Sequence, residues 1–515
     1  MNDVDAIVVG SGAGGLSAAL RLKQLGASVL LLEAMPSFGG YMNPFRRNGY
    51  IFDTGVHYLG KLAPGGSFQM LLQLLELDKA VSFIEIDPDG FDRYHFPTFE
   101  LRMCKNRAAY QQRLLSLFPD DEKAIARYFG VIDRLLSAFS DPHGPPKTWL
   151  DRIRYILRHP VLMKYHRATY QRLLDGITRN PNLAAALSAH CGNCGLPPDR
   201  ASAFVALMLL DHYMDGAFYP KGGSGALRDA FVQALERNNA SLQKRTPVTA
   251  ITRRQGRFQI TTARGDTYTA RTVISNVDPI ITLRDIVDPA LVPRAIKKKI
   301  ARMTPSAGAF YAFIGTTMDL SAAGMTDANL IHYGHDSVNR TYSAIDQRAP
   351  TDPFPYFFMT SPSLKDPESG HAPEGHHCLE IISGLGHDHI FQQWRRTTVS
   401  RLRGEAYQEL KEEVGMRLIQ SAERYLPGLS KQLDFVEFAT PLSNAYWVNS
   451  YEGANFGPDQ TPRQFGPGRF MDCRAGIEGL FLAGAGTISG GVLGCMASGV
   501  WAAQQAVDHL DGKTK

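Results

Sequence analysis

The chain has 515 residues, which is enough for two domains, because a single hydrophobic core stops growing near about 250–300 residues. Its hydrophobic content of 44% and charged content of 20% are those of a globular protein. The formal net charge of +5 is small for this length, so we expect no nucleic-acid partner. The longest apolar run, at 203–210, falls short of the roughly 20 residues that span a membrane.

The cysteine pattern favours a reducing compartment. Cys191 and Cys194 form a CxxC, but no second CxxC or thioredoxin-like context accompanies it. We therefore expect two reduced thiols rather than a redox pair or half of a metal site. The first residues carry no basic segment, so we expect no signal peptide and a cytoplasmic protein. No metal site is predicted, because the loop histidines match no ligand spacing and are expected to be solvated: His371, His376, His377, His387 and His389.

A strand, a glycine-rich turn, a helix and a second strand follow one another at the start of the chain. The apolar run 5–9 is typical of a buried strand, and 16–25 has the spacing of a helix. Gly26 ends that helix, and 28–33 reads as the second strand. This order is that of the dinucleotide-binding βαβ unit.

The turn of this unit carries the glycines that a dinucleotide needs. Gly10 permits the tight turn, Gly12 lets the backbone approach a pyrophosphate, and Gly15 lets the helix pack closely on the strand. The start of the helix offers free N–H groups and a positive dipole end to the phosphates. Glu33, at the end of the second strand, can accept hydrogen bonds from ribose hydroxyls and disfavours NADP.

The next segments favour FAD over NAD. A glycine pair at 39–40 comes shortly after the second strand, and Phe52-Asp53-Thr54-Gly55 opens a segment that runs to Gly60. Here the sequence resembles the flavin amine-oxidase-like superfamily, in its phytoene-desaturase, carotenoid-isomerase and retinol-saturase branch. The resemblance implies that the glycine pair lies beside the flavin phosphates and ribityl chain, and that the segment around Gly55 passes the isoalloxazine ring. Tyr41 stands where amine oxidases usually have arginine, so an ionic contact is missing there.

The end of the chain carries a second strand, glycine loop and helix. The strand is predicted at 479–483, the loop at 484–494 and the helix at 495–503. In the resembled family this stretch closes over the flavin, with the helix N-terminus near the pyrimidine edge of the ring. A positive helix end there would stabilise the anionic reduced flavin.

The resemblance implies an α/β fold, with an FAD-binding Rossmann-like domain built from discontinuous segments and a mixed α+β substrate domain. We place the FAD-binding domain at 1–75, 215–285 and 470–515. The substrate- and membrane-facing domain takes 76–214 and 286–469. In the second domain we predict strands at 309–315, 356–360 and 377–383 and a helix within 405–425.

The implied cofactor is one non-covalent FAD per chain. No second dinucleotide motif is present, so we expect direct reduction by NAD(P)H to be slow. The predicted cofactor-binding residues come from both glycine-rich ends, from the segment at Gly55 and from a strand expected on the adenine side: Gly10, Gly12, Ala13, Gly14, Gly15, Glu33, Ala34, Gly39, Gly40, Tyr41, Gly55, Val248, Gly484, Gly486, Gly491 and Val492.

The implied function is that of an FAD-dependent oxidoreductase acting on a lipophilic polyene, carotenoid- or retinoid-like, by saturation, desaturation or isomerisation of a double bond. His57 and Tyr58 are the candidate catalytic residues, because they belong to the segment expected beside the flavin ring. The apolar segments 309–315 and 440–447 could line a tunnel for a carbon chain. Two alternatives stay open: a flavin amine oxidase, and a flavin-bound lipid-binding protein without turnover.

A basic and apolar stretch lies between the motifs. Residues 147–179 hold eight Lys or Arg against two Asp, with apolar side chains interspersed. This pattern predicts a basic amphipathic helix, which suits either a membrane surface or a solvated face packed on the domain. The resemblance favours peripheral membrane contact, because such enzymes draw oily substrates from bilayers.

Overall fold

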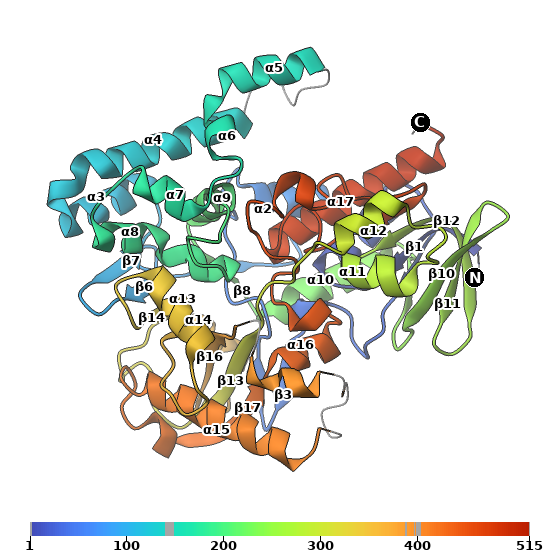
Figure 1. The fold of residues 1–515 in the computed structure, drawn as a ribbon. Helices are drawn as coiled ribbons and strands as arrows, with labels where there is room; N and C mark the ends of the chain where they lie inside the picture. Colours follow the sequence, from blue (N-terminus) through green and yellow to red (C-terminus); the bar gives the residue numbers. More distant parts are fainter. Residues whose placement is uncertain (1–2, 140–148, 387–388, 396, 398–402, 514–515) are drawn as a thin grey trace.

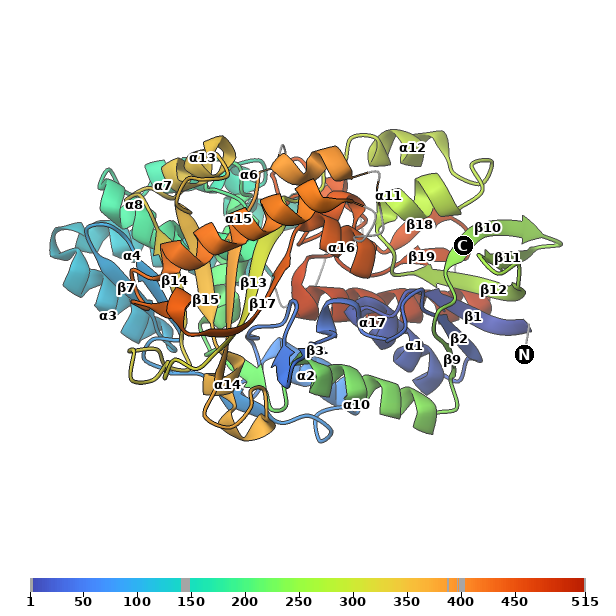
Figure 2. The same cartoon turned by 90° about the horizontal axis from the view of Figure 1, so that it is seen from below.

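The protein is described by a computed structural model that covers residues 3–139, 149–386, 389–395, 397 and 403–513. Its strands form two large sheets that lie in two lobes, side by side in Figures 1 and 2. The two short ladders β3 (Phe45–Arg47) with β4 (Tyr50–Phe52), and β5 (Phe83–Glu85) with β8 (Phe218–Pro220), complete the strands.

The first lobe contains a mixed sheet whose path is β10-β11-β12-β1-β2-β9. Strands β1 and β2 run parallel, as a βαβ unit requires, and β12 pairs parallel with β1 on its other side. The outer edge of β12 pairs first with β11 and then with β19. The bounds are β1 Asp3–Val9, β2 Val29–Leu32, β9 Ser241–Gln243, β10 Val248–Arg254, β11 Arg257–Thr262, β12 Thr267–Ser275, β18 Arg474–Ile477 and β19 Leu480–Leu482.

Helices cover both faces of this sheet because successive strand side chains point to opposite faces. In β1, Ala6 and Val8 join the core under one layer of helices, whereas Ile7 and Val9 join the core on the opposite face. The first layer holds α1 (Ala13–Gln24), α10 (Ser224–Arg237) and α17 (Gly491–Leu510), and the second holds α11 (Pro279–Ile281) and α12 (Arg294–Ile300).

The core of the second face continues past the predicted domain limit at residue 285. Val287, Val292, Ile300 and Met303 are buried in one cluster with strands of the first sheet. This part of the chain packs on the nucleotide-type sheet although the sequence placed it in the other domain. The domain limits otherwise stay a prediction.

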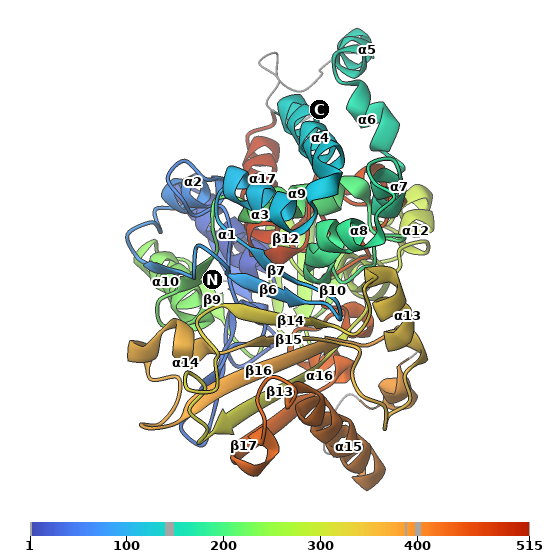
Figure 3. The ribbon, with the colours of Figure 1, turned by 90° about the vertical axis from the view of Figure 1, so that its left-hand side faces the viewer.

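The second lobe contains a seven-stranded sheet in the order β17-β13-β16-β15-β14-β6-β7, which Figure 3 shows with helices on both sides. Helix α15 (Glu405–Ala422) packs on the β13–β16–β17 part. The predictions at 309–315, 356–360, 377–383 and 405–425 are confirmed as β13, β15, β16 and α15. The strands are β6 Asp92–His95, β7 Glu100–Met103, β13 Ala309–Thr316, β14 Asn329–Tyr333, β15 Tyr356–Thr360, β16 His377–Gly384 and β17 Leu433–Ala439.

Short helices build the rest of this lobe and link it to the first. Among the described residues, none of the helices is long and apolar enough to cross a membrane. They include α2 Ser67–Leu74, α3 Arg107–Leu117, α4 Glu122–Phe139, α7 Tyr170–Asp175, α8 Pro181–Ser188, α9 Ala203–Tyr213, α13 Val338–Gln347, α14 Pro362–Lys365 and α16 Pro441–Trp447.

The single amphipathic helix predicted within 147–179 is wrong. Residues 147 and 148 lie outside the described part, and the rest forms α5 (Trp149–Arg158), α6 (Pro160–Tyr165) and α7. Pro160 ends α5 because proline cannot continue a helix without losing a hydrogen bond. Helix α5 projects from the body at the top of Figure 1.

The close contact of α1 with α17 depends on Gly499. A Cβ there would lie 2.1 Å from the carbonyl oxygen of Gly14, and backbone cannot swing aside. We therefore expect Gly499→Ala to lower the free energy of unfolding by about 1–3 kcal/mol, as overpacking does. Gly130→Ala, in α4, is the matched control, because its Cβ would meet nothing closer than 3.7 Å. Thermal melts should show the control unchanged or slightly stabilised; equal melting of both variants would contradict the packing argument.

Candidate active site

A cavity of about 970 Å³ opens between the two lobes. Its wall combines the ends of β1 and β2, the starts of α1 and α17, part of β13 and one side of α9. The carboxyl ends of parallel strands are the usual ligand site of such sheets. One half of the cavity is therefore made of backbone-rich glycine turns, and the other of side chains from the second lobe.

The glycine turn after β1 brings backbone close to backbone. Gly10 has a φ of +86°, which favours glycine, and it starts the turn. A Cβ on Gly15 would lie 1.9 Å from the carbonyl oxygen of Gly10, so only glycine lets α1 pack here. Gly12 has an ordinary φ of −62°, and a Cβ on it would meet the Asn276 side chain at 2.8 Å.

Two helix N-termini face this half of the cavity. Helix α1 has Gly12 as its N-cap and α17 has Gly490, and neither receives a side-chain cap. The first N–H groups of an uncapped helix lack intrahelical partners and attract negative charge. This cradle of uncapped N–H groups and glycines fits the pyrophosphate of a dinucleotide.

Glu33 is held firmly at the end of β2. Its Oε2 accepts hydrogen bonds from the backbone N–H of Ser11, at 2.9 Å, and from the Ser11 hydroxyl. Its Oε1 accepts from the backbone N–H of Met35 at 2.8 Å. A carboxylate has about four acceptor positions, so Glu33 keeps capacity for ribose hydroxyls.

The C-terminal glycine loop is fixed by a buried arginine. Arg469 is 1% exposed and donates to the carbonyl oxygens of Thr487 at 3.0 Å, Pro458 at 3.1 Å and Ala485. A guanidinium has five N–H donors in a rigid fork, so it can hold several loop carbonyls at once. The sequence analysis did not identify Arg469, since it lies outside the glycine motif that it supports.

The structure brings the predicted cofactor residues together. Of the sixteen, Gly15 lies behind the wall, and the following line the cavity: Gly10, Gly12, Ala13, Gly14, Glu33, Ala34, Gly39, Gly40, Tyr41, Gly55, Val248, Gly484, Gly486, Gly491 and Val492. Tyr41 donates a hydrogen bond to the carbonyl oxygen of Ala454 at 3.0 Å, and its ring packs against Gly55. Which of these residues touch FAD stays a prediction.

The candidate catalytic residues His57 and Tyr58 also line the cavity. The His57 side chain is 15% exposed, and its Nδ1 lies 2.9 Å from Oε2 of the fully buried Glu380. Burial and the nearby Lys365 ammonium lower the pKa of His57 to about 4. His57 is therefore a neutral imidazole at neutral pH.

Tyr58 has its own carboxyl partner. Its hydroxyl donates to Asp92 at 2.9 Å and accepts from the Asn193 amide at 2.7 Å. Asp92 is fully buried and also accepts from Tyr94 at 3.0 Å and from Asn329 at 2.8 Å. Burial raises the pKa of Asp92 despite these hydrogen bonds.

A buried lysine lies behind both residues. Lys365 Nζ donates to the His57 carbonyl oxygen at 2.8 Å, to Asn329 at 2.7 Å and to Thr360 at 2.6 Å. All three donor positions of the ammonium are thus used. Burial lowers the pKa of Lys365 to about 8. Lys365 therefore ties the 57–58 backbone to β14 and β15.

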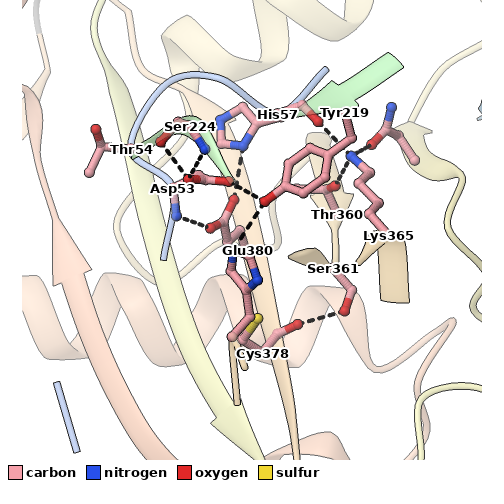
Figure 4. Close-up of polar contacts among 12 residues, drawn as sticks. Asp53, Thr54, His57, Tyr219, Ser224, Thr360, Ser361, Lys365, Cys378 and Glu380 are labelled. Carbon is pink, nitrogen blue, oxygen red and sulfur yellow. Dashed lines mark hydrogen bonds and ion pairs between the residues drawn. The ribbon is translucent and has the colours of Figure 1, made fainter. Parts of the chain in front are cut away.

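Asp53 is the centre of a second group of contacts, which Figure 4 shows beside His57 and Glu380. Its carboxylate accepts from Tyr219 at 2.5 Å and from the Ser224 N–H and hydroxyl at 3.0 and 2.5 Å. Its own N–H donates to Glu380 at 2.7 Å. These contacts join the start of the 53–60 segment to β8, α10 and β16.

Of two expectations about other residues, one is wrong and one holds. His371 was expected to be solvated, but it is 2% exposed, and its Nε2 lies 3.2 Å from the Tyr219 hydroxyl. The polar contacts with Tyr219 offset the burial of its ring. Cys191 and Cys194 are free and buried, as expected for reduced thiols, and Cys194 lines the cavity.

The half of the cavity away from the glycine turns is largely apolar and aromatic. Ala309 and Tyr311 of β13 and Trp447 of α16 line it, which confirms that 309–315 and 440–447 contribute to one wall. The sequence did not predict the other lining residues, which come from α9, α13, β15 and the segment before β18. These additional lining residues include Val205, Met208, Leu209, Tyr213, Tyr342, Tyr356, Phe358 and Phe465.

Known proteins are similar in sequence to nearly the whole of this chain. An all-trans-retinol 13,14-reductase of Danio rerio is 26% identical over 96% of this chain and 84% of its own. A Danio rerio protein described as an inactive all-trans-retinol 13,14-reductase is 25% identical over 99% and 87%. The chloroplastic prolycopene isomerase of Arabidopsis thaliana is 25% identical over 98% and 83%.

Solved structures agree on the fold. An oxidoreductase from Methanosarcina mazei superposes with a TM-score of 0.64 at 16% identity, covering 97% of this chain and all of its own. The model of the family described as flavin containing amine oxidoreductase matches residues 13–507. The chain therefore belongs to the flavin-containing amine oxidoreductase family, and its cofactor is FAD.

Proposed function

We propose that this enzyme uses FAD to act on a lipophilic polyene of the retinoid or carotenoid type, at one carbon–carbon double bond. The full-length similarity to retinol 13,14-reductases and prolycopene isomerases is the observation that carries the proposal. The apolar and aromatic half of the cavity supports it, because such a lining suits a carbon chain and excludes water.

Residues in one half of the cavity would bind the cofactor, and residues in the other half would orient the substrate and hold or move protons. The uncapped starts of α1 and α17 would hold the pyrophosphate and the flavin ring, and Glu33 would accept from the ribose. When bound, FAD supplies hydride transfer at a double-bond carbon. His57 and Tyr58 would lie at the reacting bond, where each can hold or move a proton, while the aromatic wall orients the chain.

We also propose that α5 and α6 contact an anionic membrane surface. Helix α5 leaves a row of apolar side chains exposed, among them Trp149 at 68% and Leu157 at 75%. Arg154, Arg158 and Lys164 stand beside them on the same two helices. Apolar side chains next to basic ones are the pattern of interfacial helices.

Gly12→Val should abolish flavin binding and leave the fold intact. The backbone at Gly12 is ordinary and the Cβ would meet only the end of the Asn276 side chain, which can move aside, whereas the valine side chain fills the approach to the pyrophosphate. The flavin-to-protein ratio of the purified variant should fall to near zero while its far-UV circular dichroism stays that of the wild type. A fully yellow variant would show that the dinucleotide lies elsewhere.

His57→Ala and Tyr58→Phe should each lower polyene turnover by at least about tenfold, or about 1.4 kcal/mol of barrier, without releasing FAD. Tyr58→Phe keeps the ring and removes the hydroxyl that bonds Asp92 and Asn193. Tyr446→Phe is the matched control, because Tyr446 is 39% exposed on α16. Chromatographic product analysis with a panel of polyenes measures turnover. Normal turnover by both site variants would remove their catalytic role and leave the cofactor site standing.

Reversing the charges of Arg154, Arg158 and Lys164 should weaken binding to anionic liposomes and keep the flavin content. Each basic side chain near such a surface contributes about 1 kcal/mol. Reversing Arg294, Lys297 and Lys298 on α12 is a control with the same change in charge away from α5. Co-sedimentation at increasing salt measures the effect. If the wild type does not bind anionic vesicles, or if the α5–α6 charge reversal leaves binding unchanged, α5 and α6 are not the membrane-binding surface.

A further inference from the structure

Glu380 is a buried carboxyl group with one oxygen directed at the cavity wall. It lies on β16 between the buried residues Leu379 and Ile381 and is 0% exposed. Oε1 accepts the N–H of Asp53 at 2.7 Å, whereas Oε2 lies 2.9 Å from His57 Nδ1. Neither Oε2 nor Nδ1 forms a hydrogen bond in the part of the chain that the structure describes, so their 2.9 Å approach is a close contact without hydrogen-bond geometry. Each of these two atoms therefore has its hydrogen-bonding capacity free for the other.

His57 stands between this carboxyl and the cavity. Its Nδ1 is buried against Glu380, and its ring is part of the cavity wall. Figure 4 shows the imidazole above Glu380, with Nδ1 turned towards the carboxyl. The contact is short but off the ideal hydrogen-bond direction, as catalytic hydrogen bonds commonly are before substrate binds.

The charges around Glu380 favour its protonated form. Asp53 brings a second carboxyl close, and Cys378, Tyr219 and Tyr311 face it from β16, β8 and β13. Lys365 acts on it from α14 but gives its hydrogen bonds to other groups. Burial and Asp53 raise the pKa of Glu380 well above its ordinary value. A proton on Glu380 Oε2 would face the Nδ1 atom of His57, which the lowered pKa of His57 keeps neutral.

We propose that Glu380 is a proton store that acts through His57, so that the site is built to saturate a double bond. The inference rests on the proposed function and selects the reductive branch of it. Glu380 does not touch the substrate. Its position behind His57 decides which imidazole nitrogen carries the proton and replaces that proton after it is given away.

The transfer balances without any further reactant. Saturation would add a hydride, which a bound reduced flavin would supply, to one carbon and a proton to its neighbour. His57 Nε2–H gives that proton, while Glu380 Oε2–H gives its own to His57 Nδ1. The imidazole ends neutral in its other tautomer and the carboxyl ends as carboxylate; before the next turnover His57 Nε2 takes one proton from solvent, and Nδ1–H returns its proton to Glu380 Oε2.

The resting holoenzyme tests the store directly by infrared spectroscopy. A protonated carboxyl group has a carbonyl stretch that a carboxylate lacks and that shifts in D2O. At neutral pH the wild type should show this band, and Glu380→Gln should lack it. Glu437→Gln is the matched control: Glu437 pairs with the same Phe313 from β17, but is 44% exposed. A wild type without the band, or a band that Glu380→Gln keeps, overturns the proposal.

Turnover tests the transfer itself. Glu380→Gln should lower kcat for polyene reduction by about a hundredfold or more, within the range of general acid catalysis, with KM little changed. The fall of kcat with rising pH, as Glu380 loses its proton, should vanish in the variant. Unchanged kcat or an unchanged pH profile overturns the proposal. If Glu380→Gln does not fold, His57→Gln replaces it, and the carboxyl band must then shift because its acceptor has changed; an unmoved band counts against the pair.

The two readouts separate this inference from the function on which it rests. A wild type that shows the Glu380 band but reduces no polyene would remove the function and with it the proton delivery. A wild type that reduces polyenes without needing Glu380 would keep the function and remove the store. Product formed by isomerisation alone, with no hydrogen added, would also contradict the reductive assignment.

Discussion

The close packing of α1 against α17 is the constraint on which the rest of the site depends. The two helices come from opposite ends of the chain, and both begin at glycine turns with uncapped N–H groups. Gly499 lets the α17 backbone reach that of Gly14. This contact places the starts of both helices at one cavity. The pyrophosphate cradle and the loop at 484–491 therefore depend on the same packing.

The wall of the cavity opposite the glycine turns contains buried ionisable groups, and burying them costs free energy. Asp53, Asp92, Glu380 and Lys365 are all buried, and an isolated charge in such a place would be strongly destabilising. Asp53 and Lys365 each make three side-chain hydrogen bonds, which offset that cost. The pKa values of Asp92 and Glu380 are raised, and protonation lowers the cost of burial because a neutral acid carries no charge. This polar layer fixes the 53–60 segment and supplies titratable groups beside a largely apolar cavity.

The sequence predicted the parts of the fold whose signals are local. The βαβ order at the start of the chain, the strands at 309–315 and 356–360, and the order of strand, glycine loop and helix at the end of the chain follow from periodicity and glycine spacing, although the last helix begins at Gly491 and not at 495 and runs to Leu510. Glu380 and Lys365 could not be found in this way, because each is a single polar residue whose partners lie far away in the chain. A glutamate inside the apolar strand 377–383 was the one local sign. Pro160 is also a local sign that the basic stretch is not one helix, but the prediction of a single helix followed the pattern of charged and apolar residues.

A single anaerobic reaction tests the central claim, that reduced FAD in this cavity acts on a polyene. Reduced holoenzyme is mixed with all-trans retinoids and carotenoids, and flavin absorbance is followed while products are separated. The flavin should be reoxidised in step with the appearance of a polyene that has one double bond fewer. Flavin that stays reduced with every polyene, while a small amine bleaches the oxidised enzyme, would contradict it and identify an amine oxidase.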